Sequence, residues 1–229
     1  MLPEGCISVI ISFTTPVDAI RLSILSRGFK AAAESDIVWD KFLPSDHQHI
    51  VSRSVSPILL DNKKDLYFRL SESPILLDKG KMSFWLEKTN GKKCYLLSSR
   101  QLTISYSDTE LFWEYTFDAD SRFPEVALLN NVDLLDIRGK IGTRELSSRT
   151  NYDEDEAEER ATIVILAART PKGKLPEKRS DGWLEVAIGK LYNGESGDDN
   201  GDVEARLLDS RPFHAKVGLI IEGIEFRPI

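Results

Sequence analysis

Residues 84–97 decide how this chain is divided into a helical part and a β-rich part. They contain, in order, Phe84-Trp85-Leu86, Asn90-Gly91 and Cys94-Tyr95-Leu96-Leu97. Asn-Gly between two short apolar runs is typical of a β-hairpin, because both residues accept the left-handed backbone of a tight turn. From Lys81 onward, short runs of this kind alternate with turn residues, which indicates a sandwich or barrel. The further predicted strands are 102–106, 112–117, 126–129, 134–141, 162–168, 183–188, 203–207 and 217–226.

The residues before this stretch have a helical pattern. A first helix is expected over the apolar run 5–13. Thr15 and Pro16 form an N-cap and first-turn pair, and the helix that they begin is expected to end at Gly28. Shorter helices are expected at 29–33 and after Ser35. Helices this short cannot cover all their large apolar side chains, so part of that surface is expected to bind a partner.

Two further segments have a distinct composition. Residues 46–80 are expected to form a connector with its own helix at 63–70, where Leu66 and Leu70 have helical spacing. Residues 153–159 are a nearly pure acidic run, and such a run is typical of a solvated loop because like charges repel.

The composition limits the class of protein. The chain has 229 residues, which allows one large domain or a small one plus a medium one. Its net charge of -7 argues against a nucleic-acid partner, because phosphate binding requires concentrated Lys and Arg. The N-terminus lacks a signal-peptide pattern, no apolar run approaches the length of a membrane helix, and no glycosylation sequon occurs. We therefore expect a protein of the cytoplasm or nucleus that has no membrane partner.

No residue pattern predicts catalysis or a cofactor. Cys6 and Cys94 each lie in an apolar run and are interpreted as small buried hydrophobes. His47 and His49 could hold a metal ion in principle, but no further ligand supports them. Phosphate-binding loops and nucleophile motifs are absent from the sequence. The expectation is a non-enzymatic protein without a cofactor.

The N-terminal segment resembles an F-box. The resemblance rests on Leu2-Pro3-Glu4, the apolar run, the Thr14-Thr15-Pro16 break, an amphipathic helix and Val38-Trp39-Asp40-Lys41-Phe42-Leu43-Pro44. It implies binding to the Skp-type adaptor of a cullin-type ubiquitin ligase. The adaptor contacts that it implies are Leu2, Pro3, Ile10, Pro16, Ile20 and Leu25. A helical cap folded onto the β-domain is the alternative interpretation.

The remainder resembles a Nictaba-type (phloem protein two) lectin domain. Four blocks carry the likeness in the family's order: 92–104, 121–129 followed by 135–141, 179–186 and 218–228. The resemblance implies a jelly-roll-like sandwich that recognises glycans or glycoproteins containing N-acetylglucosamine. The predicted fold class is thus α+β, a short helical F-box followed by an all-β sandwich. The predicted domains are the F-box at 1–45, the helical connector at 46–80 and the lectin domain at 81–229.

The resemblance also places a carbohydrate site. A sugar site needs an aromatic ring for the apolar face of the pyranose and polar groups for its hydroxyls. The family's aromatic positions hold Tyr106, Trp113 and Tyr115 here, and both tyrosines stand where tryptophan is usual. Two alternatives remain open: these rings belong to the core, or the sandwich binds a protein or peptide with a degenerate sugar site. The family's apolar strand after Tyr152 is replaced by the acidic run, so a sheet edge is missing or is supplied by 162–168.

Overall fold

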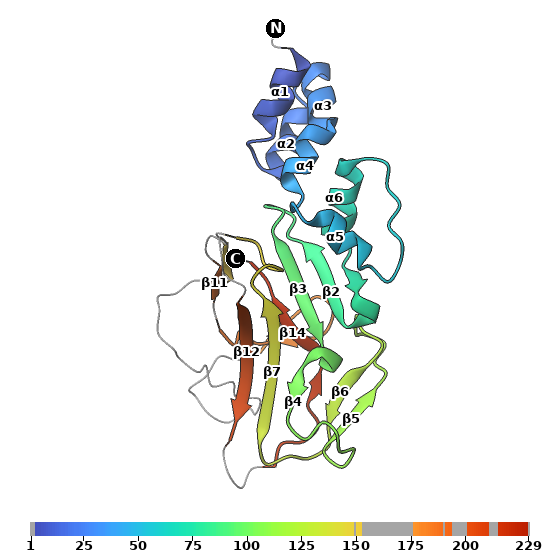
Figure 1. Ribbon diagram of the computed structural model, residues 1–229, viewed down its shortest axis with the longest axis vertical. Helices are drawn as coiled ribbons and strands as arrows, with labels where there is room; N and C mark the ends of the chain where they lie inside the picture. Colours follow the sequence, from blue (N-terminus) through green and yellow to red (C-terminus); the bar gives the residue numbers. More distant parts are fainter. Residues whose placement is uncertain are drawn as a thin grey trace. The chain divides into compact units, whose positions relative to one another are not determined.

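The computed structural model describes residues 3–148, 150–152, 176–189, 191–193, 201–210 and 215–228 (Figure 1). The chain forms two compact units, Met1–Tyr95 with Pro228 and Leu96–Arg227 with Ile229. Leu2, the acidic run 153–159 and the predicted strand 162–168 lie outside the described residues.

The first unit begins with four short helices, α1 (Glu4–Ile11), α2 (Pro16–Ser23), α3 (Arg27–Glu34) and α4 (Asp36–Phe42). Side chains cap three of them: Thr15 Oγ1 accepts the N–H of Asp18 at 3.1 Å, and Ser26 and Ser35 serve α3 and α4. The predicted helices are confirmed, with one correction. Gly28 does not end the second helix. It lies in the first turn of α3, because the Ser26 side chain starts that helix two residues earlier.

A ring cluster forms the centre of this unit. Trp39 is 1% exposed, and its ring centroid lies 5.6 Å from that of Phe42, 5.3 Å from Tyr67 and 5.2 Å from Phe68. Its Nε1–H donates to the carbonyl of Ala33 at 2.7 Å. The indole therefore joins α3 and α4 to α6 (Lys63–Glu72), the helix that the spacing of Leu66 and Leu70 predicted.

The rest of the first unit contains two elements that the sequence did not predict. These are α5 (His47–Ser52) and the strand β1 (Ile75–Leu77), which pairs antiparallel with β2 (Met82–Leu86). The short helix η1 (Asp78–Gly80) joins the two strands. Arg53 forms an ion pair with Asp78 at 2.6 Å, and this guanidinium lowers the pKa of the Asp78 carboxyl.

The predicted Asn-Gly hairpin is confirmed. It joins β2 to β3 (Lys93–Ser98), which begins in the first unit and ends in the second. The N–H of Glu87 donates to Lys92 O at 2.8 Å and closes the loop. Gly91 has a φ of +70°, and a Cβ there would lie 2.6 Å from Phe42 O. The turn needs glycine for both reasons.

The second unit consists of antiparallel strands. Among the described residues, two three-stranded sheets have the orders β12-β7-β4 and β13-β6-β5, and two two-stranded sheets have the orders β11-β8 and β10-β9. The strands β12, β7 and β4 can be followed in Figure 1. The elements are η2 (Ser99–Gln101), β4 (Thr103–Ile104), β5 (Trp113–Thr116), β6 (Val126–Leu129), β7 (Leu135–Gly142), β8 (Thr150–Tyr152), β9 (Glu177–Lys178), β10 (Leu184–Glu185), β11 (Leu191–Asn193), β12 (Asp202–Asp209), β13 (Ile220–Ile221) and β14 (Gly223–Phe226). Helices followed by antiparallel strands confirm the α+β class.

The longest strand pair, β7 with β12, carries a charged cluster. Arg206 lies opposite Arg138 in the register. Both guanidinium groups donate to the carboxylate of Asp136, with Nη2 to Oδ2 distances of 2.8 and 2.7 Å. The two arginines hold the pKa of Asp136 well below its usual range. The cluster therefore stabilises this pair through charge-assisted bonds at neutral pH.

Two glycines mark close approaches in the second unit. A Cβ on Gly139 would lie 3.0–3.3 Å from the side chains of Leu102, Ile224 and Leu97. A Cβ on Gly223 would lie 1.9 Å from the carbonyl oxygen of Leu97. The start of β14 thus passes directly against the end of β3, which only glycine permits.

Candidate functional site

The helices α1 and α2 and the residues that follow them leave several large apolar side chains exposed. Phe13 is 82% exposed and Ile24 is 83% exposed. On their inner sides the same helices bury Ile7, Ile11 and Ala19. The inner residues account for the folding of these helices, and the outer ones need another explanation. The helical apolar set comprises Val9, Ile10, Phe13, Ile20, Ile24 and Leu25.

The predicted adaptor contacts differ in accessibility. Ile10, Ile20 and Leu25 belong to the helical apolar set and are exposed. Pro3 is exposed as the N-cap residue of α1, and its carbonyl accepts the N–H of Cys6 at 3.0 Å. Pro16 is buried in the first turn of α2, where it shapes the helix start. The contact role of these residues stays a prediction.

Tyr106 is the most accessible of the three predicted sugar-binding rings. It is half exposed, and its φ of +66° is in the left-handed region. Its ring packs at 5.5 Å against Phe112, with the planes tilted by 56°. The N–H of Thr109 donates to its carbonyl at 3.2 Å. The loop from 105 to 112 therefore presents one tyrosine ring on a hydrogen-bonded turn.

Trp113 lies inside the unit. The side chain is 2% exposed, and its Nε1–H donates to the carbonyl of Ser105 at 3.1 Å. Its ring has no free face for a sugar in this conformation, so stacking would require the indole to leave the core. Trp113 is therefore a core residue in this structure, which agrees with the alternative that these rings belong to the core. It also holds Ser105, the neighbour of Tyr106, in place.

The ring of Tyr115 is covered by a cation. The guanidinium carbon of Arg100 lies 3.5 Å from the ring centroid. Arg100 Nε donates to Glu125 Oε2 at 2.8 Å, and this bond lowers the pKa of the Glu125 carboxyl. Arg100 therefore occupies a face of the ring that a sugar would otherwise contact. A role for Tyr106 and Tyr115 in sugar binding stays a prediction.

Two exposed apolar residues near these rings were not predicted. Leu111 is 72% exposed in the loop before β5, and Phe117 is 74% exposed just after it. The sequence did not indicate that these two side chains are exposed, because both lie at the ends of a run that is typical of an ordinary strand.

A half-buried charged cluster around Arg179 was also missed. Arg179 contacts Glu225 at 2.9 Å and Asp181 at 2.7 Å. Burial raises the pKa of Glu225, although Arg227, Arg179 and Arg122 act in the opposite direction. Arg179 and Glu225 are 46 residues apart in the chain, so no local pattern could have paired them.

The histidines considered as a metal site have other partners. His47 Nε2 lies 2.7 Å from Lys63 Nζ, and its Nδ1 lies 2.9 Å from the carbonyl of Pro44. Within the described residues, no group of three or more His, Cys, Asp or Glu side chains could hold a metal ion. In the part of the chain that the structure describes, no helix is both long enough and apolar enough to span a bilayer.

The structure defines an α+β protein in which short helices with exposed apolar side chains precede an antiparallel β-unit. Residues 92–154 and 154–228 match the model of the Phloem protein 2 family. The chain belongs to that family, and within it to the plant F-box proteins, as the resemblance predicted.

Relatives in Arabidopsis thaliana match nearly the whole chain. F-box protein PP2-B10 is 37% identical, over 99% of this chain and 92% of its own length. Putative F-box protein PP2-B12 is 39% identical over 99% and 96%, and F-box protein SKIP3 is 36% identical over 99% and 87%. The family match is divided at residue 154, within the acidic run where the sequence departs from the family pattern.

Proposed function

We propose that this chain is the substrate-recognition subunit of an SCF-type ubiquitin ligase, active in the cytoplasm or nucleus. The helical segment binds a Skp-type adaptor, and the phloem protein 2 domain binds the client. The protein carries out no bond chemistry. It raises the local concentration of the client near the ubiquitin-transfer machinery.

The helical apolar set is the observation that carries the first half. Phe13 and Ile24 are more than four-fifths exposed in a family whose members include F-box proteins. Leaving such side chains in water forgoes about 1.5–3 kcal/mol each, which a partner surface recovers. Their position at the ends of α1 and α2 agrees with the region that the F-box resemblance assigns to the adaptor.

The test is a calorimetric titration of the full chain with a purified Skp-type adaptor. Phe13→Ser and Ile24→Ser should each weaken binding by at least about tenfold, because each removes a large side chain from a buried interface. Leu208→Ser removes an exposed leucine from the other unit and serves as the matched control. Unchanged affinity in both helical variants would refute this placement of the contact.

For the second half, we propose a glycan or glycoprotein containing N-acetylglucosamine as the client. Tyr106 supplies a ring, and the exposed carboxylates of Asp108 and Glu110 supply hydrogen-bond acceptors for sugar hydroxyls. A single shallow site of this kind gives a dissociation constant on the order of 1 mM to 1 µM.

A protein or peptide client is the second candidate. Leu111 and Phe117 favour it, because both are largely exposed and neither offers a hydrogen bond to a sugar. The burial of Trp113 and the cover that Arg100 places over Tyr115 favour it as well.

Calorimetry with N-acetylglucosamine oligomers separates these candidates. If Tyr106 and Tyr115 bind sugar, Tyr106→Ala should abolish the signal, and Arg100→Ala should leave it unchanged or strengthen it by uncovering the Tyr115 ring. No heat of binding at millimolar oligomer would exclude the glycan proposal and leave the protein-binding one.

A further inference from the structure

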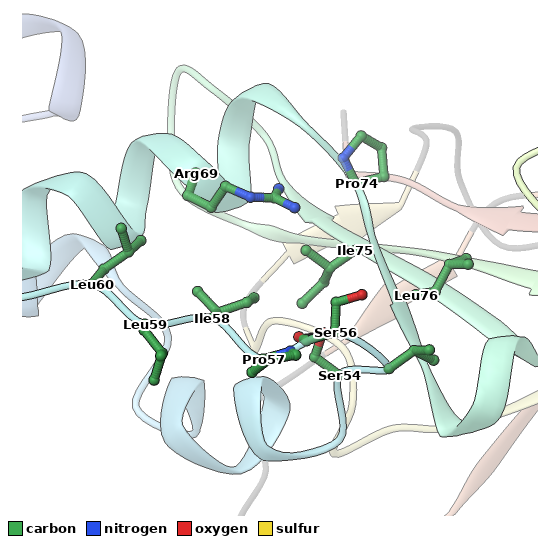
Figure 2. A pocket seen from close by; sticks show the side chains of 11 residues that line it. Ser54, Ser56, Pro57, Ile58, Leu59, Leu60, Arg69, Pro74, Ile75 and Leu76 are labelled. Atoms are coloured by element: carbon green, nitrogen blue, oxygen red, sulfur yellow. Dashed lines mark hydrogen bonds between the residues drawn. The ribbon is translucent and has the colours of Figure 1, made fainter.

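The connector of the first unit contains a groove that the proposed function does not use. It has a volume of about 390 Å³ and opens between the chain at 54–60, the helix α6 and the start of β1 (Figure 2). This volume lies in the range of ligand-binding clefts, about 300–1,000 Å³. It is lined by Ser54, Val55, Ser56, Pro57, Ile58, Leu59, Leu60, Arg69, Pro74, Ile75 and Leu76.

The lining is mostly apolar and partly open to water. Leu59 is 88% exposed, and Val55 and Leu60 are exposed as well. Ile75 is buried at the base. Figure 2 shows Ile58 and Ile75 beside the same space, with Leu59 and Leu60 on opposite sides of the connector chain. A neighbouring group of exposed apolar side chains in an extended segment indicates a surface that another chain covers.

One cation lines this groove. Arg69 extends from α6 over the space, as Figure 2 shows, and its Nη1 donates to the carbonyl of Ser73 at 2.7 Å. That bond fixes the guanidinium at the groove and leaves other N–H donors available. Within the described residues Arg69 has no ion-pair partner, and it is the only charged residue that lines the groove. An acidic group is the complementary ligand for it.

The sequence around the groove shows what kind of chain fits. The hexapeptide Ser-Pro-Ile-Leu-Leu-Asp occurs twice, at 56–61 and at 73–78, and both copies contribute to the lining. The second copy contains β1, whose Ile75 and Leu77 are buried and lie opposite Phe84 and Met82 of β2. In the first copy, residues 57–60 form neither helix nor strand. Identical residues thus form a covered strand where an apolar partner strand is present and stay exposed where none is.

We propose that the groove docks an extended segment of a partner protein that carries apolar side chains and one acidic side chain. The apolar side chains cover the first hexapeptide as β2 covers the second, and the carboxylate pairs with Arg69. The partner segment is thus recognised in an extended form, through its apolar side chains and one carboxylate. None of the residues that line the groove belongs to either surface of the proposed function, so the groove adds a contact with a partner protein.

The probe is a fluorescein-labelled peptide, Met-Ser-Phe-Trp-Leu-Glu, which copies residues 82–87 of this chain and is amidated so that Glu is the only carboxylate of its six residues. A second peptide ends in Lys instead. Fluorescence anisotropy with the full chain should show at least about tenfold tighter binding of the Glu peptide. Arg69→Glu should reverse that preference, and Leu59→Ser should weaken both peptides. Arg27→Glu, at another exposed arginine, should change neither.

Three results would overturn the proposal. The first is no anisotropy change with either peptide up to about 1 mM chain, the weakest affinity of interest. The second is an unchanged preference for the Glu peptide in Arg69→Glu, with the fold of the variant verified by circular dichroism. The third is a concentration-dependent dimer in sedimentation that Leu59→Ser abolishes, because the occupant would then be a second copy of this chain.

Discussion

Replacing Trp113 by Phe tests whether this ring is a core residue or a sugar-stacking one. The change removes the Nε1–H that donates to Ser105 O at 3.1 Å and leaves that carbonyl without its donor. A lost bond with an unsatisfied buried partner costs about 1–3 kcal/mol. The smaller ring adds about 1 kcal/mol through lost packing at a site that is 2% exposed. We therefore expect a loss of about 2–4 kcal/mol in the free energy of unfolding.

Urea unfolding followed by far-ultraviolet circular dichroism measures this loss without relying on tryptophan emission. With a slope of about 2 kcal/mol per molar, the midpoint should fall by about 1–2 M. Tyr115→Phe is the matched control. It removes one hydroxyl from a half-buried ring on the same strand and should stay within about 0.5 kcal/mol of wild type. A Trp113→Phe variant with an unchanged midpoint but no sugar binding would refute the core assignment.

Three other outcomes follow from close contacts and charges in the second unit. Gly223→Ala places a Cβ 1.9 Å from Leu97 O, so β14 and β3 must separate. Thermal unfolding should show a loss of about 3 kcal/mol or more in the free energy of unfolding. Gly201→Ala, where no atom lies closer than 3.9 Å to the added Cβ, should show little change. The pKa of Asp136 is lowered by Arg206 and Arg138, so its stabilisation is present above the unfolded value near 4 and is lost as the pH falls below it. In urea unfolding, the free energy of unfolding of Asp136→Asn should lie below that of wild type, and this difference should shrink between about pH 6 and pH 3. A difference that stayed constant over this range would contradict the reasoning. Burial raises the pKa of Glu225, so its contribution is full below the unfolded value and declines as the pH rises through the folded one. The stability advantage of wild type over Glu225→Gln should therefore be smaller at pH 7 than at pH 4, and an advantage that grew with pH would reverse the sign.

Local signals predicted the elements that depend on local bonds. Thr15 and Ser35 cap helices because their hydroxyls reach a backbone N–H two or three residues ahead. Gly91 turns the chain because it accepts a φ of +70°, and Asn90 supports the turn through its Oδ1, which accepts the N–H of Lys92 at 2.8 Å. Gly28 was misread because a glycine in a first helical turn has the same sequence appearance as one that ends a helix. Only the cap made by Ser26 distinguishes the two cases.

The strand β1 shows where local reasoning ends. Its hexapeptide is identical to residues 56–61, so no property of the six residues themselves could predict a strand at one place and an irregular segment at the other. The difference comes from β2, which lies beside the second copy and buries Ile75 and Leu77. β-propensity depends on packing partners in this way.

The presence or absence of packing partners also separates the predicted sugar-binding residue Trp113 from the predicted adaptor contacts. Trp113 belongs to a strand with neighbours on its inner face and a carbonyl within reach of its N–H, so the β-unit buries it. The predicted adaptor contacts Ile10 and Ile20 belong to helices of eight residues, which have one buried side and, among the described residues, no further layer over the other. An apolar residue type alone therefore does not identify a binding surface. The number of layers available to cover it does, and for this reason the helical apolar set supports a partner contact more strongly than the aromatic residues of β5 support a sugar site.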